Sequence, residues 1–146
     1  MTALLASELT VGERFETVVV EDLKRTQIVQ YAGASGDYNP LHTDEVYATK
    51  IAGYPSVFAH GMLTMGLTGR AVAGLVGAES LLRFGVRFTA QVWPGDILTV
   101  RSSVVRIEDS EDGPVAEFSV STVAQSPVTG EDREVVSGYA HARLVR

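Results

Sequence analysis

The pattern of hydrophobic and polar residues changes in character about halfway along the chain. Residues 21–77 show helical spacing and turn-forming sequences, without sustained alternation. Residues 80–145 instead alternate between apolar and polar side chains over short runs, which is typical of strands. In Leu82–Ala90, for example, Phe84 and Phe88 lie on the same parity and arginines on the other. This segregation predicts an α+β fold, with helix packed on one side of an antiparallel sheet.

Five segments are predicted to form the sheet: Phe15–Val20, Leu82–Ala90, Ile97–Ile107, Val115–Ala124 and Glu134–Val145. One face of the fourth segment is expected to hold Ala116, Phe118, Val120 and Thr122. Sequences such as Trp93-Pro94-Gly95-Asp96 supply the turns. A sheet wrapped on a single helix leaves an edge and an outer face uncovered, so we expect a dimer.

The helical half contains one long apolar segment, Ala59–Val76. Its 18 residues would form a rod of roughly 27 Å, at 1.5 Å per residue. Arg70, His60 and four glycines argue against a membrane span. We therefore predict a helix buried nearly all round, with small residues where the sheet backbone comes close.

A shorter helix is expected to start beside the acidic Glu21 and Asp22 and to end at Gly33 and Gly36. One or two further helical turns are expected in Asp44–Lys50. The stretch between them is rich in turn-forming residues.

Composition narrows the class of protein. The 146 residues fit one domain, 1–146, and a hydrophobic fraction of 45% with 21% charged residues is typical of a globular chain. The absence of cysteine excludes disulfides, thiolate metal sites and cysteine nucleophiles. A net charge of −6 disfavours a nucleic-acid surface. The amino terminus lacks the features of a signal peptide, so we expect a cytoplasmic protein.

Three histidines are candidates for acid–base chemistry. His141, in the last strand, is expected to be a surface or half-buried residue, and His60 to cap the apolar helix or form a hydrogen bond. His42 follows Asp37 at an interval that a turn at Asn39 can fold back, so that the two side chains could hold one water. The spacing alone favours a plainer interpretation, in which Asp37 forms an Asx turn and His42 faces solvent.

Other reaction classes have less support. The chain lacks the GxSxG sequence of serine hydrolases and the HExxH or paired-histidine spacing of zinc sites. Its helical glycines do not follow a strand, as a dinucleotide-binding loop requires. Gly61, at the start of the apolar helix, offers a backbone N–H suited to an oxyanion formed from a carbonyl.

Three blocks of sequence resemble a known family. Tyr31–Ala48 (YAGASGDYNPLHTDEVYA) closely resembles the hydratase-2 motif of the MaoC-like family, and Phe58–Gly66 and Val86–Asp96 resemble the blocks that follow it. The resemblance covers about residues 20–96 and departs at Gln91, where many relatives have proline. It implies a hotdog fold, in which an antiparallel sheet wraps around one central helix and two domains pair with the active site at their interface.

The resemblance also implies a reaction and its residues. Asp37 and His42 correspond to the family's catalytic pair, Asn39 to an asparagine that shapes the site, and Gly61 to the amide that contacts the thioester carbonyl. The implied reaction is reversible addition of water to a trans-2-enoyl thioester, giving the (3R)-hydroxyacyl thioester, in fatty-acid metabolism. It requires no metal and no redox cofactor.

Several alternatives stay open. A hotdog thioesterase would need a carboxylate on the central helix, and Ala59–Val76 contains none. The chain could also be active only in a heterodimer with a second hotdog subunit. The acyl carrier is either coenzyme A or acyl carrier protein, and Lys50, Arg83 and Arg87 are candidates for contact with an acidic carrier.

Overall fold

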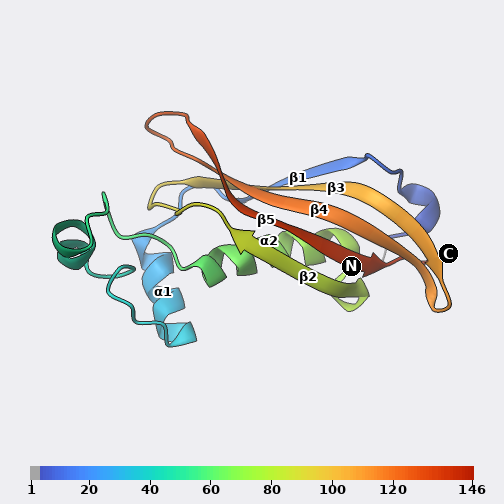
Figure 1. Ribbon diagram of the computed structural model, residues 1–146, viewed down its shortest axis with the longest axis horizontal. Coiled ribbons are helices and arrows are strands. Elements are labelled where there is room, and N and C mark those ends of the chain that lie inside the picture. Colours follow the sequence, from blue (N-terminus) through green and yellow to red (C-terminus); the bar gives the residue numbers. More distant parts are fainter. Residues whose placement is uncertain (1–3) are drawn as a thin grey trace.

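The computed structural model describes residues 4–146 and contains one five-stranded antiparallel sheet (Figure 1). The strands are β1 Arg14–Val20, β2 Leu81–Phe88, β3 Ile97–Ser110, β4 Gly113–Gln125 and β5 Asp132–Arg143. Their order across the sheet is β1-β3-β4-β5-β2, so β1 and β2 are the two edges. The five predicted strands are therefore present, and each pairs antiparallel with its neighbours.

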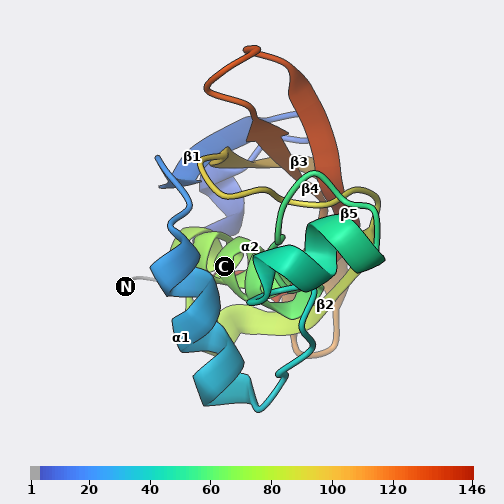
Figure 2. The ribbon, with the colours of Figure 1, turned by 90° about the vertical axis from the view of Figure 1, so that its left-hand side faces the viewer.

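One long helix, α2 (Gly61–Val76), runs along the inner face of the sheet, in the arrangement of a hotdog fold. The helix α1 (Arg25–Ser35) and a π-helical turn, η2 (Tyr47–Ile51), lie across the N-terminal end of α2 (Figure 2). Two one-turn helices complete the order, η1 (Ala6–Glu8) and η3 (Ala78–Ser80). Within residues 4–146, no helix combines the length and hydropathy needed to cross a bilayer.

The core between α2 and the sheet follows the predicted alternation. The β4 residues expected to share one face are each at most 1% exposed: Ala116, Phe118, Val120 and Thr122. The hydroxyl groups of Thr122 and Thr68 lie 2.6 Å apart, and Thr68 donates to the carbonyl of Thr64 at 2.8 Å. These bonds satisfy the buried hydroxyls and fix α2 on β4.

The prediction that the central helix is buried nearly all round is wrong for the single chain. Met62 is 56% exposed, and Gly66 and Arg70 are exposed on the following turns of the same face. The predicted approach of sheet backbone is not found at Gly61 or Gly69, where a Cβ would meet phenylalanine rings of β2. A Cβ on Gly66 would meet nothing within 4 Å. One face of α2 is therefore open.

The helix α1 begins at Arg25 rather than beside Glu21, as the acidic residues suggested. The preceding Leu23 is 1% exposed, and its N–H donates to the carbonyl of Asp96 at 3.0 Å. Its carbonyl accepts from Gly95 at 2.8 Å. These two hydrogen bonds hold Leu23 against the turn before β3. The helix therefore begins two residues later, at Arg25, and its position relative to the sheet is fixed.

Candidate active site

The catalytic segment expected from the sequence is a folded loop that follows α1. The helix ends at Gly36, which adopts a left-handed conformation (φ 73°) and donates to the carbonyl of Ala32. Two side chains then bond the backbone ahead of them: Asp37 Oδ1 accepts from Asn39 N at 3.2 Å, and Asn39 Oδ1 accepts from Leu41 N at 3.0 Å. These successive Asx turns reverse the chain and bring Asp37 and His42 to one side.

The facing atoms of this pair are Asp37 Oδ2 and His42 Nε2, which lie 3.9 Å apart. The other ring nitrogen, Nδ1, donates to the carbonyl of Phe58 at 2.7 Å, so the neutral imidazole carries its proton there and Nε2 is an acceptor. Two acceptors at this separation are too distant to bond each other. They are well placed to accept one hydrogen bond each from the same water molecule.

The surroundings of His42 favour its neutral form. Burial lowers the pKa of its imidazole below the ordinary 6.5, and the Coulombic effect of nearby His60 acts in the same direction. The bond to Phe58 and the charge of Asp37 act the other way, and burial prevails. His42 is therefore an unprotonated base near neutral pH.

The plainer interpretation of this segment is half right. Asp37 does form an Asx turn, but through only one of its oxygens. His42 is 9% exposed and does not face solvent. The side chain of Asn39 accepts its hydrogen bond from the backbone N–H of Leu41, which is consistent with a role in shaping the loop.

His60 also lies at this site, which the sequence did not predict. It is the N-cap residue of α2 but forms no side-chain cap, and of the two expected roles, capping or hydrogen bonding, the hydrogen bond is present. Its Nε2 lies 3.0 Å from the carbonyl oxygen of Asp37, and its ring stacks on His42 with centroids 3.8 Å apart. A buried histidine next to Gly61 at a helix start was the available signal, but burial could not be read from the sequence.

Gly61 is the first residue of α2, one residue after His60. The helix starts there rather than at Ala59 because Ala59 N donates to the carbonyl of Val92 at 2.9 Å. A Cβ on Gly61 would lie 3.1–3.2 Å from the ring of Phe88, the last residue of β2. Both residues line a cavity of about 360 Å³ that also reaches Phe58, the residue that anchors His42.

Helix geometry gives Gly61 its chemical value. The first N–H groups of a helix have no intrahelical acceptor and point out of its positive end. Without a side chain at Gly61, a ligand carbonyl can approach that N–H closely. A carbonyl in the adjoining cavity could thus receive a hydrogen bond from α2, while a water lies near His42.

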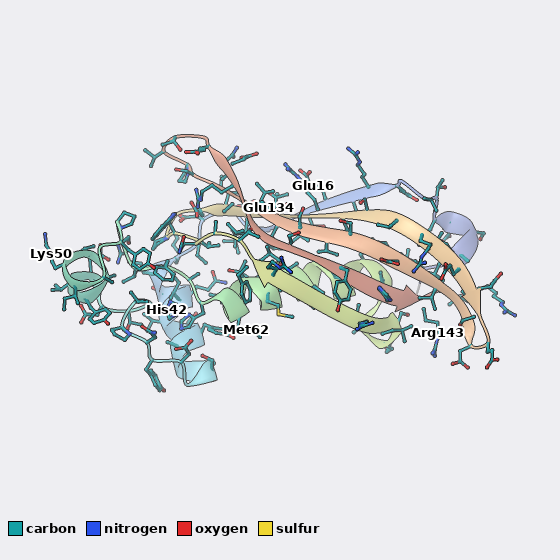
Figure 3. All side chains as sticks on the ribbon, in the orientation of Figure 1. Glu16, His42, Lys50, Met62, Glu134 and Arg143 are labelled. Atoms are coloured by element: carbon teal, nitrogen blue, oxygen red, sulfur yellow. The ribbon has the colours of Figure 1, made fainter. Side chains whose placement is uncertain are left out.

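The remaining candidates lie elsewhere. Lys50 points outward from η2, at the same end of the molecule as His42 (Figure 3). Arg83 and Arg87 are exposed on the outer face of β2, and the guanidinium of Arg83 lies 5.7 Å from the ring centre of Tyr139. His141 is half-buried on β5, as expected. The structure therefore does not unite the three basic candidates in one patch.

Asp37, His42 and His60 are the nearest approach to a metal-ligand set within residues 4–146. One nitrogen or oxygen from each lies within 4.8 Å of the others. A metal ion bound at about 2.0–2.1 Å needs lone pairs that converge on it. The two rings are stacked with centroids 3.8 Å apart, and one nitrogen of each is already bonded to a backbone carbonyl, at Phe58 and Asp37. The set fits a bound water better than a metal ion.

Comparison with known proteins identifies a family model and several relatives that are similar to this chain. The family model for the MaoC like domain matches residues 6–125. The 3-hydroxyacyl-thioester dehydratase Y of Mycobacterium tuberculosis is 43% identical over 68 residues, which cover 44% of this chain and 23% of that protein. The peroxisomal enoyl-CoA hydratase 2 of Arabidopsis thaliana is 28% identical over 130 residues, 87% of this chain and 37% of that protein. The chain thus spans well under half the length of these relatives.

Solved structures match over nearly the whole chain. An R-hydratase of Pseudomonas aeruginosa gives a TM-score of 0.77 at 28% identity, covering 97% of this chain and 87% of that one. An (R)-hydratase of A. caviae gives 0.72 at 26% identity, with coverage of 95% and 99%. The match of one family model to most of the sequence, together with the hotdog architecture, shows that the chain belongs to the MaoC-like family.

Proposed function

We propose that residues 1–146 form a single MaoC-like hotdog domain that adds water reversibly to trans-2-enoyl thioesters, giving (3R)-hydroxyacyl thioesters. One observation carries the proposal. A carboxylate and a neutral imidazole acceptor lie 3.9 Å apart, and the imidazole is fixed by a carbonyl on its other side. Similarity to proteins named as hydratases and dehydratases supports the same reaction.

The pair activates a water molecule. Asp37 Oδ2 and His42 Nε2 each accept a hydrogen bond from the water, which leaves the lone pairs of its oxygen free to attack the substrate. As the oxygen bonds to the β carbon, one O–H bond breaks and its proton passes to the pair. A proton from the pair is then delivered to the α carbon, so that hydrogen and hydroxyl are added and nothing else is consumed. Acid–base assistance of this kind is typically worth about a hundred- to ten-thousand-fold.

Gly61 acts on the other end of the conjugated system. Attack at the β carbon moves negative charge onto the thioester oxygen, and the N–H of Gly61 at the start of α2 would stabilise it. Loss of one such donor typically costs about 2.7–4 kcal/mol of activation free energy. The cavity beside Gly61 and Phe88 is the proposed route for the thioester.

We also propose that the domain works as a dimer. Strand β2 is an edge, its Leu82 and Phe88 are each 48% exposed, and Met62 of α2 is 56% exposed. A second hotdog domain on this side would cover that apolar surface. The partner is either a second copy or a different hotdog subunit. Hotdog neighbours from complexes of Mycobacterium tuberculosis, at 20% and 17% identity, share the fold.

The carrier and the compartment are further predictions. We propose coenzyme A or acyl carrier protein as the thiol, with Arg83 and Arg87 as the basic residues nearest to Phe88 along β2. Cytoplasmic location also remains a prediction from the sequence.

A paired assay tests the reaction. Purified protein is mixed with crotonyl-CoA, and the loss of enoyl-thioester absorbance is followed alongside the release of free thiol. Hydration predicts absorbance loss without thiol, whereas a thioesterase releases thiol.

Light scattering on the same sample gives the oligomeric state. A stable but inactive homodimer would contradict the homodimer form of the proposal and would direct the search to a second subunit. A series of enoyl chain lengths, on both carriers, then defines the substrate.

A further inference from the structure

His60 contacts both members of the proposed catalytic pair. Its Nε2 donates to the backbone carbonyl of Asp37 at 3.0 Å, because a carbonyl can only accept. Its ring lies on that of His42, with centroids 3.8 Å apart and planes inclined by 28°. The side chain of Asp37 is 53% exposed, whereas His42 is 9% exposed and His60, at the start of the central helix, is 1% exposed.

Burying His60 destabilises the folded protein more than burying an apolar side chain of the same size would. Its Nδ1 is buried and has no hydrogen-bond partner within residues 4–146. A buried polar atom without a partner destabilises the folded state, and an apolar side chain of similar size would avoid this. The N–H on the opposite side of the ring, which does have a partner, is therefore the feature that an apolar residue could not replace.

We propose that His60 is a positioning residue that sets the separation of Asp37 and His42, by holding the backbone of the first and the ring of the second. The inference rests on the proposed function for its catalytic meaning. The anchor transmits the rigidity of α2 to the loop, since His60 is the residue immediately before Gly61. The water-binding pair and the oxyanion donor are then fixed relative to each other through one residue.

The contact has an electrostatic consequence for His42. The Coulombic effect of His60 lowers the pKa of His42, as does the burial to which the stacked ring contributes. The ionisable groups facing these rings are Asp37, on the loop, and Tyr31, on α1, whose ring centroid is 4.9 Å from that of His60. Replacing His60 therefore raises the pKa of His42, and the acid limb of the rate profile moves to higher pH.

Two variants separate the two contacts. His60→Phe keeps a stacking ring but removes the N–H donor, and His60→Gln keeps an N–H donor but removes the ring. His141→Phe is the matched control, because His141 is half-buried on β5 and no part of the site. We expect kcat to fall about tenfold or more in both His60 variants, since a misplacement of about 1 Å can cost roughly a hundredfold. KM should change by less than about threefold, and the control should be unchanged.

NMR gives a readout that does not depend on catalysis. The chain has only three histidines, so their imidazole signals can be assigned by substitution. In the unsubstituted protein, His60 should carry its proton on Nε2, and His42 should titrate at higher pH in His60→Phe than in the unsubstituted protein. A proton on Nδ1 of His60 would overturn the proposal even if neither variant folds.

The outcomes distinguish the two claims. Unchanged kcat together with unchanged His42 titration in folded His60 variants would refute the positioning role and leave the hydratase proposal intact. Absence of hydration by the unsubstituted protein, with the expected tautomer and titration shift, would refute the reaction and retain the contact between His60 and the pair.

Discussion

Two carboxylates at turns show how similar side chains serve different ends. Asp96, in the turn before β3, is 2% exposed, and its Oδ2 accepts from Trp93 N at 2.8 Å and from the guanidinium of Arg133 at 2.6 Å. Asp37, in the loop after α1, has a side chain 53% exposed. One of its oxygens closes an Asx turn, and the other faces His42 across 3.9 Å.

The two carboxylates differ in how much hydrogen-bonding capacity each has left for a ligand. Asp96 has protein donors at short range, so it stabilises its turn and has little capacity left for a ligand. The Oδ2 of Asp37 faces an acceptor rather than a donor, so one water placed between them can donate a hydrogen bond to each. An acid facing a neutral base is thus suited to chemistry, and an acid facing an arginine is suited to structure.

The largest expected effect comes from the catalytic pair. Asp37→Asn keeps an oxygen for the Asx turn but weakens the acceptor, and His42→Ala removes the base. Each should lower kcat for enoyl-thioester hydration by about a hundred- to ten-thousand-fold. Both variants should still melt cooperatively. Asp112→Asn, at an exposed turn, and His141→Ala are the matched controls.

Near-normal turnover of crotonyl-CoA by either variant would falsify the site assignment. A cooperative melt lost in both variants would instead show that the loop is a structural element, like the turn at Asp96.

The next effect concerns Gly61. Gly61→Val should impair turnover strongly, and Gly61→Ala should lower it about tenfold or more, because the new Cβ meets the Phe88 ring at 3.1 Å and crowds the approach to the N–H. Gly33→Ala is the matched control within a helix, α1, where a Cβ meets nothing within 4 Å. Hydration rates and urea melts should be measured for all three. Full activity in Gly61→Ala and Gly61→Val would remove the oxyanion argument.

Asp96 should show the opposite pattern. Asp96→Asn weakens the partly buried pair with Arg133, whose side chain is 23% exposed. We expect the free energy of unfolding to fall by about 2–3 kcal/mol, as is typical when one partner of a hydrogen-bonded charge pair is lost. The kcat of the folded fraction should change little. In Asp112→Asn, where the contact with Arg143 is 3.9 Å and the acid 82% exposed, the change should be under about 0.5 kcal/mol. An Asp96→Asn variant that is stable but inactive would contradict the structural role assigned to Asp96.

The sheet was predictable because alternation is a local property of the sequence. The buried face of β4 followed directly from it, and the Asx turn at Asp37 followed from residue type. The role of His60 depends on its stacked contact with His42. The start of α1 at Arg25 depends on the hydrogen bond from Leu23 to the carbonyl of Asp96. Such long-range contacts leave no local pattern, so only the structure reveals them.

The smallest expected effect is the pH dependence of the pair. Burial lowers the pKa of His42 below 6.5, so its neutral form persists to lower pH than in an unfolded chain. The acid limb of kcat/KM for hydration should therefore have its midpoint below pH 6.5. Between that midpoint and about pH 6.5 the unfolded chain binds the proton and the folded one does not, so stability falls as pH decreases.

The slope attributable to His42 cannot exceed about 1.4 kcal/mol per pH unit, the value for one proton. Urea melts between pH 5 and 7 measure it by comparing the unsubstituted protein with His42→Gln, in which the slope should be smaller. His141→Gln is the matched control, because His141 lies outside the paired rings. Suppose that the free energy of unfolding has the same pH slope in the unsubstituted protein and in His42→Gln, and that the acid limb lies above pH 6.5. His42 would then be protonated in the folded state at pH 6.5. Its Nε2 would then donate to Asp37 rather than accept from a water, and the contrast with the Asp96–Arg133 pair would disappear.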